Sequence, residues 1–106
     1  MLVASLLAAK KAQQTVVLDL RKLTVVADYF VICTGISEVH VRAMAEDLAR
    51  QLKAHGLGPG PSQGLANGRW VLLDLGDVIV HIFAEFERSF YALEQRWVEA
   101  PSLSVT

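Results

Sequence analysis

Apolar positions change their spacing several times along the chain, and each change predicts a new element. Residues 2–14 begin with paired apolar positions at helical spacing and end in lysines and glutamines, which predicts a helix with cations near its carboxyl end. Alternating apolar residues then predict a strand from Thr15 to Leu20. After a connection at 21–27, aromatic and β-branched residues predict a second strand from Tyr29 to Thr34.

The longest helical pattern follows Ser37, which can serve as an N-cap, and ends at Gly56. Its apolar residues recur at three- and four-residue steps and predict one buried stripe, while the other side carries alternating charges. Such charge pairs contribute only about 0.2–0.5 kcal/mol each, so this side is interpreted as a solvated face. Between Gly56 and Gly68 lie five of the seven glycines and two of the three prolines, which predicts a mobile loop.

Two strand patterns, Arg69–Leu75 and Val78–Ala84, are separated only by Gly76-Asp77, and glycine first in a two-residue turn predicts a type II′ hairpin. The resulting register makes one face purely aliphatic, and we expect that face to lie in the core. The reverse face pairs Trp70 with Phe83, Leu72 with His81, and Asp74 with Ile79. Because buried acids and histidines need partners, we expect this face either to be half-exposed or to cover a polar site.

The last apolar pattern predicts one helix that ends near Trp97. Its stripe consists of Phe86, Phe90, Leu93 and Trp97. Residues 98–106 contain Pro101 and several Ser and Thr residues, so we expect a frayed tail.

Composition narrows the class of protein. A chain of 106 residues with 53% apolar residues predicts one domain, 1–106, with a real core. Its formal net charge of −1 argues against a protein that binds nucleic acid through overall charge. The first residues lack the basic segment that precedes the apolar run of a secretory signal, so we expect a cytoplasmic protein, with no membrane association and with its one cysteine, Cys33, reduced.

Candidate chemistry is sparse. The sequence has none of the His or Cys spacings typical of metal sites, and it predicts no catalytic residue, metal or cofactor. Gly35-Ile36-Ser37 lies between a predicted strand and a predicted helix, where it could bind a phosphate or simply begin the helix. Trp70 and Phe83, together with charged residues near the start of the last helix, could form a protein interface or merely complete the core, and composition favours neither.

Three segments carry a resemblance to a known family. Residues 28–37 (D-Y-F-V-I-C-T-G-I-S), 69–83 (R-W-V-L-L-D-L-G-D-V-I-V-H-I-F) and 87–94 (E-R-S-F-Y-A-L-E, with Trp97) occur in the order and spacing of the ribosome silencing factor (Iojap) family. Residues 17–20 also fit the first strand of that family. The resemblance spans roughly residues 5–97.

The resemblance implies an α+β (α/β-type) domain, with helices packed on a mixed β-sheet in a nucleotidyltransferase-like topology, and a homodimer. It also implies binding to the large ribosomal subunit through ribosomal protein fourteen. The bound factor would keep the small subunit from joining and so repress translation when nutrients are short. No reaction is implied. The alternative is an enzyme that binds or transfers nucleotides at Gly35-Ile36-Ser37, but no strand carries the paired carboxylates that would hold its metal. A dimeric adaptor with another partner is the third hypothesis.

We predict that the partner contacts the reverse face of the hairpin and the start of the last helix. The rings would supply buried area, and the carboxylates would pair with basic groups of the ribosomal protein. The predicted partner-binding residues are Trp70, Asp74, His81, Phe83, Glu85, Arg88 and Tyr91.

Overall fold

The computed structural model describes residues 2–58, 60 and 62–105, apart from the side chains of residues 90 and 91. The helices are α1 (Leu2–Ala9), α2 (Glu38–Ala54), α3 (Glu85–Tyr91) and α4 (Leu93–Arg96). The strands are β1 (Gln13–Asp19), β2 (Tyr29–Gly35), β3 (Ser62–Gln63), β4 (Trp70–Asp74), β5 (Val78–Ala84) and β6 (Ser102–Ser104). No helix within the described residues is long and apolar enough to span a membrane.

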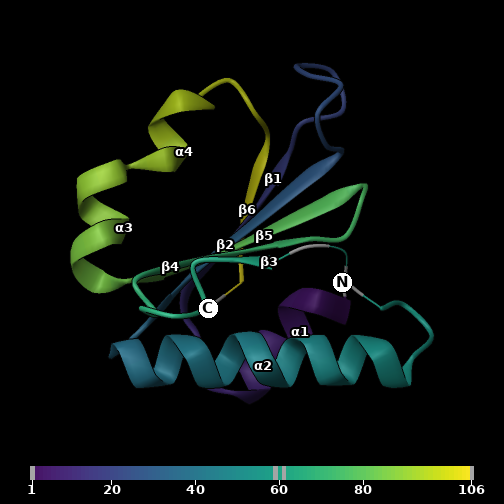
Figure 1. Ribbon diagram of the computed structural model, residues 1–106. Coiled ribbons are helices and arrows are strands. Elements are labelled where there is room, and N and C mark those ends of the chain that lie inside the picture. The colour runs from purple at the N-terminus through teal and green to yellow at the C-terminus, as the bar shows by residue number, and fades with distance from the viewer. Residues whose placement is uncertain (1, 59, 61, 106) are drawn as a thin grey trace.

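The strands form one six-stranded mixed sheet in the order β3-β4-β5-β2-β1-β6. Its two central strands, β2 and β5, pair in parallel, and every other neighbouring pair is antiparallel. Helices α1 and α2 lie on one face of the sheet, while α3 and α4 lie on the other (Figure 1). The predicted fold class, a mixed sheet with helices packed on it in one domain, is confirmed.

Each face of the sheet has its own apolar cluster. Under α1 and α2, the aliphatic face of the hairpin packs against the stripe of α2, as predicted. The four hairpin residues in this core are Val71, Leu73, Val80 and Ile82, all at most 3% exposed. Under α3 and α4, the second cluster joins Leu18, Leu20, Phe30, Ile32 and Phe83 with the partly buried Trp70, Leu93 and Trp97.

The predicted hairpin register is confirmed pair by pair. Trp70 faces Phe83, Leu72 faces His81 and Asp74 faces Ile79. The Leu75 N–H donates to the Val78 carbonyl at 2.9 Å and closes the turn. Gly76 has φ +87°, the left-handed value that a type II′ turn requires at its first central position.

Helix α2 also begins and ends as predicted. The Ser37 hydroxyl accepts a hydrogen bond from the His40 N–H at 3.0 Å and caps the helix. At the other end, the Gly56 N–H donates to Lys53 and the Leu57 N–H donates to Leu52. These two bonds form a Schellman motif, so α2 ends at Gly56 as the sequence predicts.

The first helix is shorter than the predicted 2–14. After Ala9, the Lys11 N–H donates to Ala8 and the Ala12 N–H donates to Leu7, which is again a Schellman motif. Lys11 takes the left-handed position, with φ +64°, where glycine is usual. The sequence therefore held no helix-stop signal, and Gln13 and Gln14 belong to β1 instead.

The predicted single helix through Phe86 and Trp97 was wrong, because the chain breaks at Ala92. Ala92 has φ +44° and separates α3 from α4. The break changes the direction of the helical axis, so the stripe does not stay on one side. Leu93 and Trp97 pack on the sheet, whereas Phe86 is 71% exposed.

Two segments that we expected to be irregular pair with the sheet. In the glycine-rich loop, Ser62–Gln63 forms β3 at the edge of β4. In the predicted frayed tail, 98–106, Ser102–Ser104 forms β6 and pairs with β1. Both strands are short and follow proline-containing segments, so a pattern of alternating residues could not reveal them.

Candidate functional site

The reverse face of the hairpin carries stacked and edge-on rings. Trp70 stacks on Phe83, with ring centroids 4.9 Å apart, and Phe30 meets His81 edge-on at 4.6 Å. Trp97, which follows α4, is the last member of the group, and its ring lies edge-on to Phe30 with the ring centroids 5.9 Å apart. We call these five residues, Phe30, Trp70, His81, Phe83 and Trp97, the aromatic layer.

His81 is the polar member of the aromatic layer. The Trp70 indole Nε1–H donates to His81 Nδ1, and burial lowers the pKa of His81 to about 4, which keeps the ring neutral at physiological pH. With Nδ1 as the acceptor, the proton of the neutral ring lies on Nε2. Within the described part of the chain, Nε2 is buried and has no hydrogen-bond partner.

The expectation that this face would be accessible was wrong for two of the predicted contact residues. His81 is 4% exposed and Phe83 is 0% exposed, because α3, α4 and Trp97 cover the centre of the sheet. A partner cannot touch either ring in this conformation. On the same face, the side chains of β4, which lies between β5 and the edge strand β3, remain half-buried. These are Trp70, Leu72 and Asp74.

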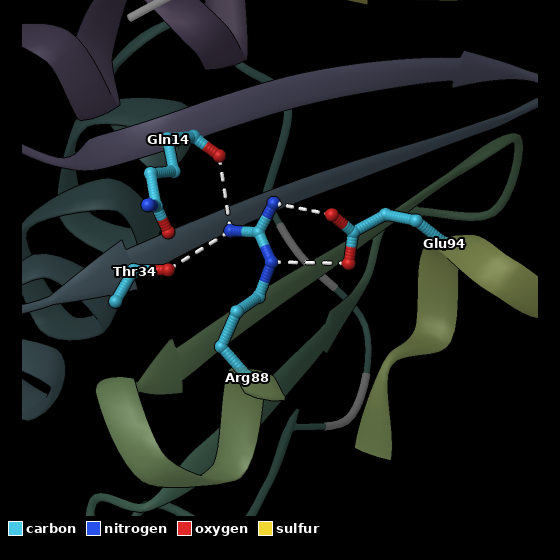
Figure 2. Close-up of polar contacts among 4 residues, drawn as sticks. All are labelled: Gln14, Thr34, Arg88 and Glu94. Carbon is cyan, nitrogen blue, oxygen red and sulfur yellow. Dashed lines mark hydrogen bonds and ion pairs between the residues drawn. The ribbon is translucent and has the colours of Figure 1, made fainter. Parts of the chain in front are cut away.

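Arg88 is also buried, at 8% exposure, and it does not point to a partner. Its guanidinium donates to the Gln14 carbonyl and to the Thr34 hydroxyl, both at 2.9 Å, and forms a two-bond pair with Glu94 at 2.7 and 3.0 Å (Figure 2). Burial would raise the pKa of Glu94, but the hydrogen bonds and charge of Arg88 outweigh it and lower that pKa. The geometry makes Arg88 an internal tie between α3 and the sheet.

Besides the half-buried Trp70, the predicted set includes two acidic residues and a tyrosine. Asp74 Oδ1 accepts the Gly76 N–H at 2.8 Å, so this carboxylate stabilises the hairpin turn and still reaches the surface. Glu85 is exposed in the first turn of α3. The side chain of Tyr91 lies outside the described residues.

Two polar groups of Gly35-Ile36-Ser37, the Ile36 N–H and the Ser37 hydroxyl, already bond within the chain. The Ile36 N–H donates to His40 Nδ1 at 3.0 Å, and the opposite ring nitrogen of His40 lies 2.8 Å from the Lys10 carbonyl. Ser37 already caps α2. A phosphate would have to displace these bonds, so this segment is better explained as the start of a helix. Among the described side chains, no group of three His, Cys, Asp or Glu could hold a metal ion.

Sequence reasoning missed an exposed apolar tip between β1 and β2. Val25 is fully exposed and Val26 is 66% exposed, and the Thr24 hydroxyl accepts the Val26 N–H at 3.1 Å to form a local turn. Leu23 lines a shallow pocket with Arg96, Trp97, Val98 and Glu99. Two adjacent valines in a connection were the available signal, but the same pattern is typical of a strand that continues into the core.

Comparisons with known proteins match this geometry to one family. The family model described as "Ribosomal silencing factor during starvation" (RsfS) matches residues 1–106. Ribosomal silencing factor RsfS of Halalkalibacterium halodurans is 42% identical over 96 residues, which cover 91% of this chain and 82% of that protein. The RsfS of Bacillus subtilis is 44% identical over 92 residues, covering 87% and 78%.

A solved structure agrees. The crystal structure of a protein from Chromobacterium violaceum superposes with a TM-score of 0.89 at 34% identity, covering 99% of this chain and 88% of that one. The resemblance found in segments 28–37, 69–83 and 87–94 is therefore confirmed at the level of the family. The chain belongs to the RsfS family of ribosomal silencing factors.

Proposed function

We propose that this chain binds the large ribosomal subunit through ribosomal protein fourteen and sterically prevents the small subunit from joining. Translation would thereby be repressed when nutrients are short. The proposal includes a cytoplasmic homodimer that makes little direct contact with nucleic acid and does not associate with a membrane. It acts by occupying a surface, with no reaction and no cofactor of its own.

The observation that carries this proposal is the half-buried strip of Trp70, Leu72 and Asp74 along β4. Helix α3 packs on β5 and β2, and the three side chains of β4 on this face keep part of their surface accessible to a partner. A half-buried tryptophan beside polar groups is typical of a protein interface, because the ring buries a large area while its rim stays wet. The carboxylates of Asp74 and Glu85 would suit a basic protein surface.

Co-sedimentation with separated ribosomal subunits tests the function. We expect the protein to pellet with large subunits and to leave the small subunits unbound. Pelleting with small subunits, or with neither, would defeat the proposal. A light-scattering assay of subunit joining then asks whether the bound protein slows association.

Three variants test the site. Trp70→Ala should weaken binding by about 10-fold or more if Trp70 is an anchor. Asp74→Asn should weaken it by a smaller factor, because the amide oxygen can still accept the Gly76 N–H while the charge is lost. Glu46→Gln, the same kind of change on the exposed face of α2, is the matched control and should bind like the wild type. Folded Trp70→Ala and Asp74→Asn variants that pellet normally would refute the site and leave the function standing.

The enzyme hypothesis has less support, because the Ile36 N–H and the Ser37 hydroxyl already bond within the chain. Incubation with nucleoside triphosphates and Mg²⁺ separates the two readings. Tight binding or measurable transfer would favour an enzyme. Sedimentation velocity of the free protein tests the homodimer, and a monomer at all concentrations would remove that part of the proposal.

A further inference from the structure

A buried arginine helps to attach α3 and α4 to the sheet. Of the side chains that the structure describes in these two helices, only that of Arg88 is buried. Leu93 is half-buried and reaches the aromatic layer, whereas Phe86 is exposed. Among the described side chains, the main attachment of this segment is therefore a hydrogen-bonded guanidinium and not an apolar residue.

The partners of Arg88 come from three separate elements. Gln14 is in β1, Thr34 is in β2 and Glu94 is in α4 (Figure 2). Gln14 and Arg88 are distant in sequence, so this one side chain ties the end of the chain to its beginning. A planar guanidinium with five donors can make such a set of bonds, and a lysine ammonium cannot reproduce its fork.

One of these partners is itself a strained residue, and a second strained residue lies between Arg88 and Glu94. Non-glycine residues with positive φ in the described chain are Lys11, Gln14 and Ala92. Gln14, with φ +51°, lies where the β1–β2 register shifts, and its own carbonyl accepts from Arg88. Ala92, with φ +44°, lies between Arg88 and Glu94, and its N–H donates to the Arg88 carbonyl at 3.1 Å. Strained backbone persists where surrounding contacts over-determine it. Gln14 is held by the guanidinium itself, whereas Ala92 lies between the backbone carbonyl of Arg88 and Glu94, the carboxylate that pairs with the guanidinium.

We propose that Arg88 is a positioning residue that couples the irregular part of β1 around Gln14 to the α3–α4 segment. Both regions hold their left-handed residues only while the guanidinium bonds are made. When these bonds break, the two regions loosen together, and the aromatic layer beneath α3 and α4 becomes accessible. Arg88 thus sets the position of Glu85 beside the β4 strip without touching a partner itself, a consequence that rests on the proposed function.

Hydrogen exchange measured by mass spectrometry tests the coupling in the free protein. Arg88→Ala and Arg88→Lys should both raise exchange at 13–17 and at 85–97 by about 10-fold or more, because several charge-assisted bonds are lost. Exchange in α2 and in the β4–β5 hairpin should stay at the wild-type rate. Arg96→Ala removes an exposed arginine from the same segment and should change neither region.

Glu94→Gln is a milder variant that keeps the coupling testable if Arg88→Ala does not fold. It removes the charge from α4 but leaves the bonds to Gln14 and Thr34 in place, so it should loosen 85–97 more than 13–17. Faster exchange at 85–97 in Arg88→Ala with wild-type exchange at 13–17 would overturn the coupling. Wild-type exchange at 85–97 in both Arg88→Ala and Glu94→Gln would overturn the role of Arg88 altogether.

Binding to the large subunit then separates positioning from direct contact. A positioning role predicts that Arg88→Lys binds as weakly as Arg88→Ala, because the fork and not the charge is needed. Recovery of wild-type binding in Arg88→Lys would overturn positioning. If wild-type protein does not bind the large subunit, the proposed function fails while the exchange experiment still decides the coupling.

Discussion

The indole Nε1–H of Trp70 donates to Nδ1 of His81 across the β4–β5 hairpin, with the two nitrogens 3.1 Å apart. Protonation of His81 would turn this acceptor into a second donor and break the bond. Burial already disfavours the charged ring and lowers the pKa of His81 from its ordinary value of 6.5 to about 4. The aromatic layer is therefore built around a neutral histidine.

Stability should consequently fall in acid. The pKa of His81 is lower in the folded protein than in the unfolded chain, so its contribution is complete above about pH 6.5 and is lost as the pH falls towards 4. The loss should reach at most about 3 kcal/mol. Urea unfolding of the wild type and of His81→Gln at several pH values in this window measures it. Identical pH dependence in the two proteins would contradict the prediction, because carboxylates titrate in both.

Gly64 should tolerate no side chain. It has φ +83°, and a Cβ at this position would lie 1.9 Å from the Trp70 carbonyl oxygen. Gly64→Ala should cost about 2–4 kcal/mol, because strain and a backbone clash combine. The matched control is Gly76→Ala, which has a similar φ of +87° but open space around its Cβ, and it should cost only about 1–2 kcal/mol. Equal free energies of unfolding for the two variants would show that the clash relaxes.

The N-cap of α2 gives a smaller and cleaner effect. Ser37→Ala removes the acceptor of the His40 N–H and should lower stability by about 1 kcal/mol. Ser37→Asp supplies another acceptor next to the positive end of the helix dipole and should recover most of the loss. Thermal unfolding of the three proteins provides the measurement. A stable Ser37→Ala protein would mean that water replaces the cap at no cost.

Cys33 should be unreactive in the folded protein. Its side chain is fully buried in β2, and burial raises the pKa of the thiol to about 12, so almost no thiolate forms near neutral pH. Reaction with a thiol-specific chromogenic reagent should be at least about 100-fold slower than in urea-unfolded protein. Rapid labelling of native protein would reveal frequent opening of the α2 side of the sheet.

The sequence predicted local features well where one pattern carried the information. The alternation on both sides of Gly76 determined the hairpin register, and the spacing after Ser37 determined α2. The sequence did not predict helix ends at residues whose backbone conformation is unusual for their type. Lys11 ends α1 and Ala92 divides the last helix, although both take a conformation usually reserved for glycine.

The sequence predicted which residues share the candidate face, but it did not predict how far their side chains are exposed to solvent. The face that carries Trp70 and His81 was assigned correctly, because alternation specifies faces. Whether that face meets solvent depends on how α3 and α4 fold back over it, and there Arg88 bonds to partners in β1, β2 and α4. No spacing within the sequence encodes those distant bonds.

The parallel pair at the centre of the sheet has a consequence for the chain as it is synthesised. β2 can pair with β1 early, but its other edge has no partner until β5 has been synthesised, because Tyr29–Gly35 pairs with residues 78–84. A nascent polypeptide that ends before this point holds a highly apolar strand with one side unmatched, and contacts so far apart in sequence form slowly. The centre of this sheet therefore forms only after residues 78–84 have emerged from the ribosome that synthesises them.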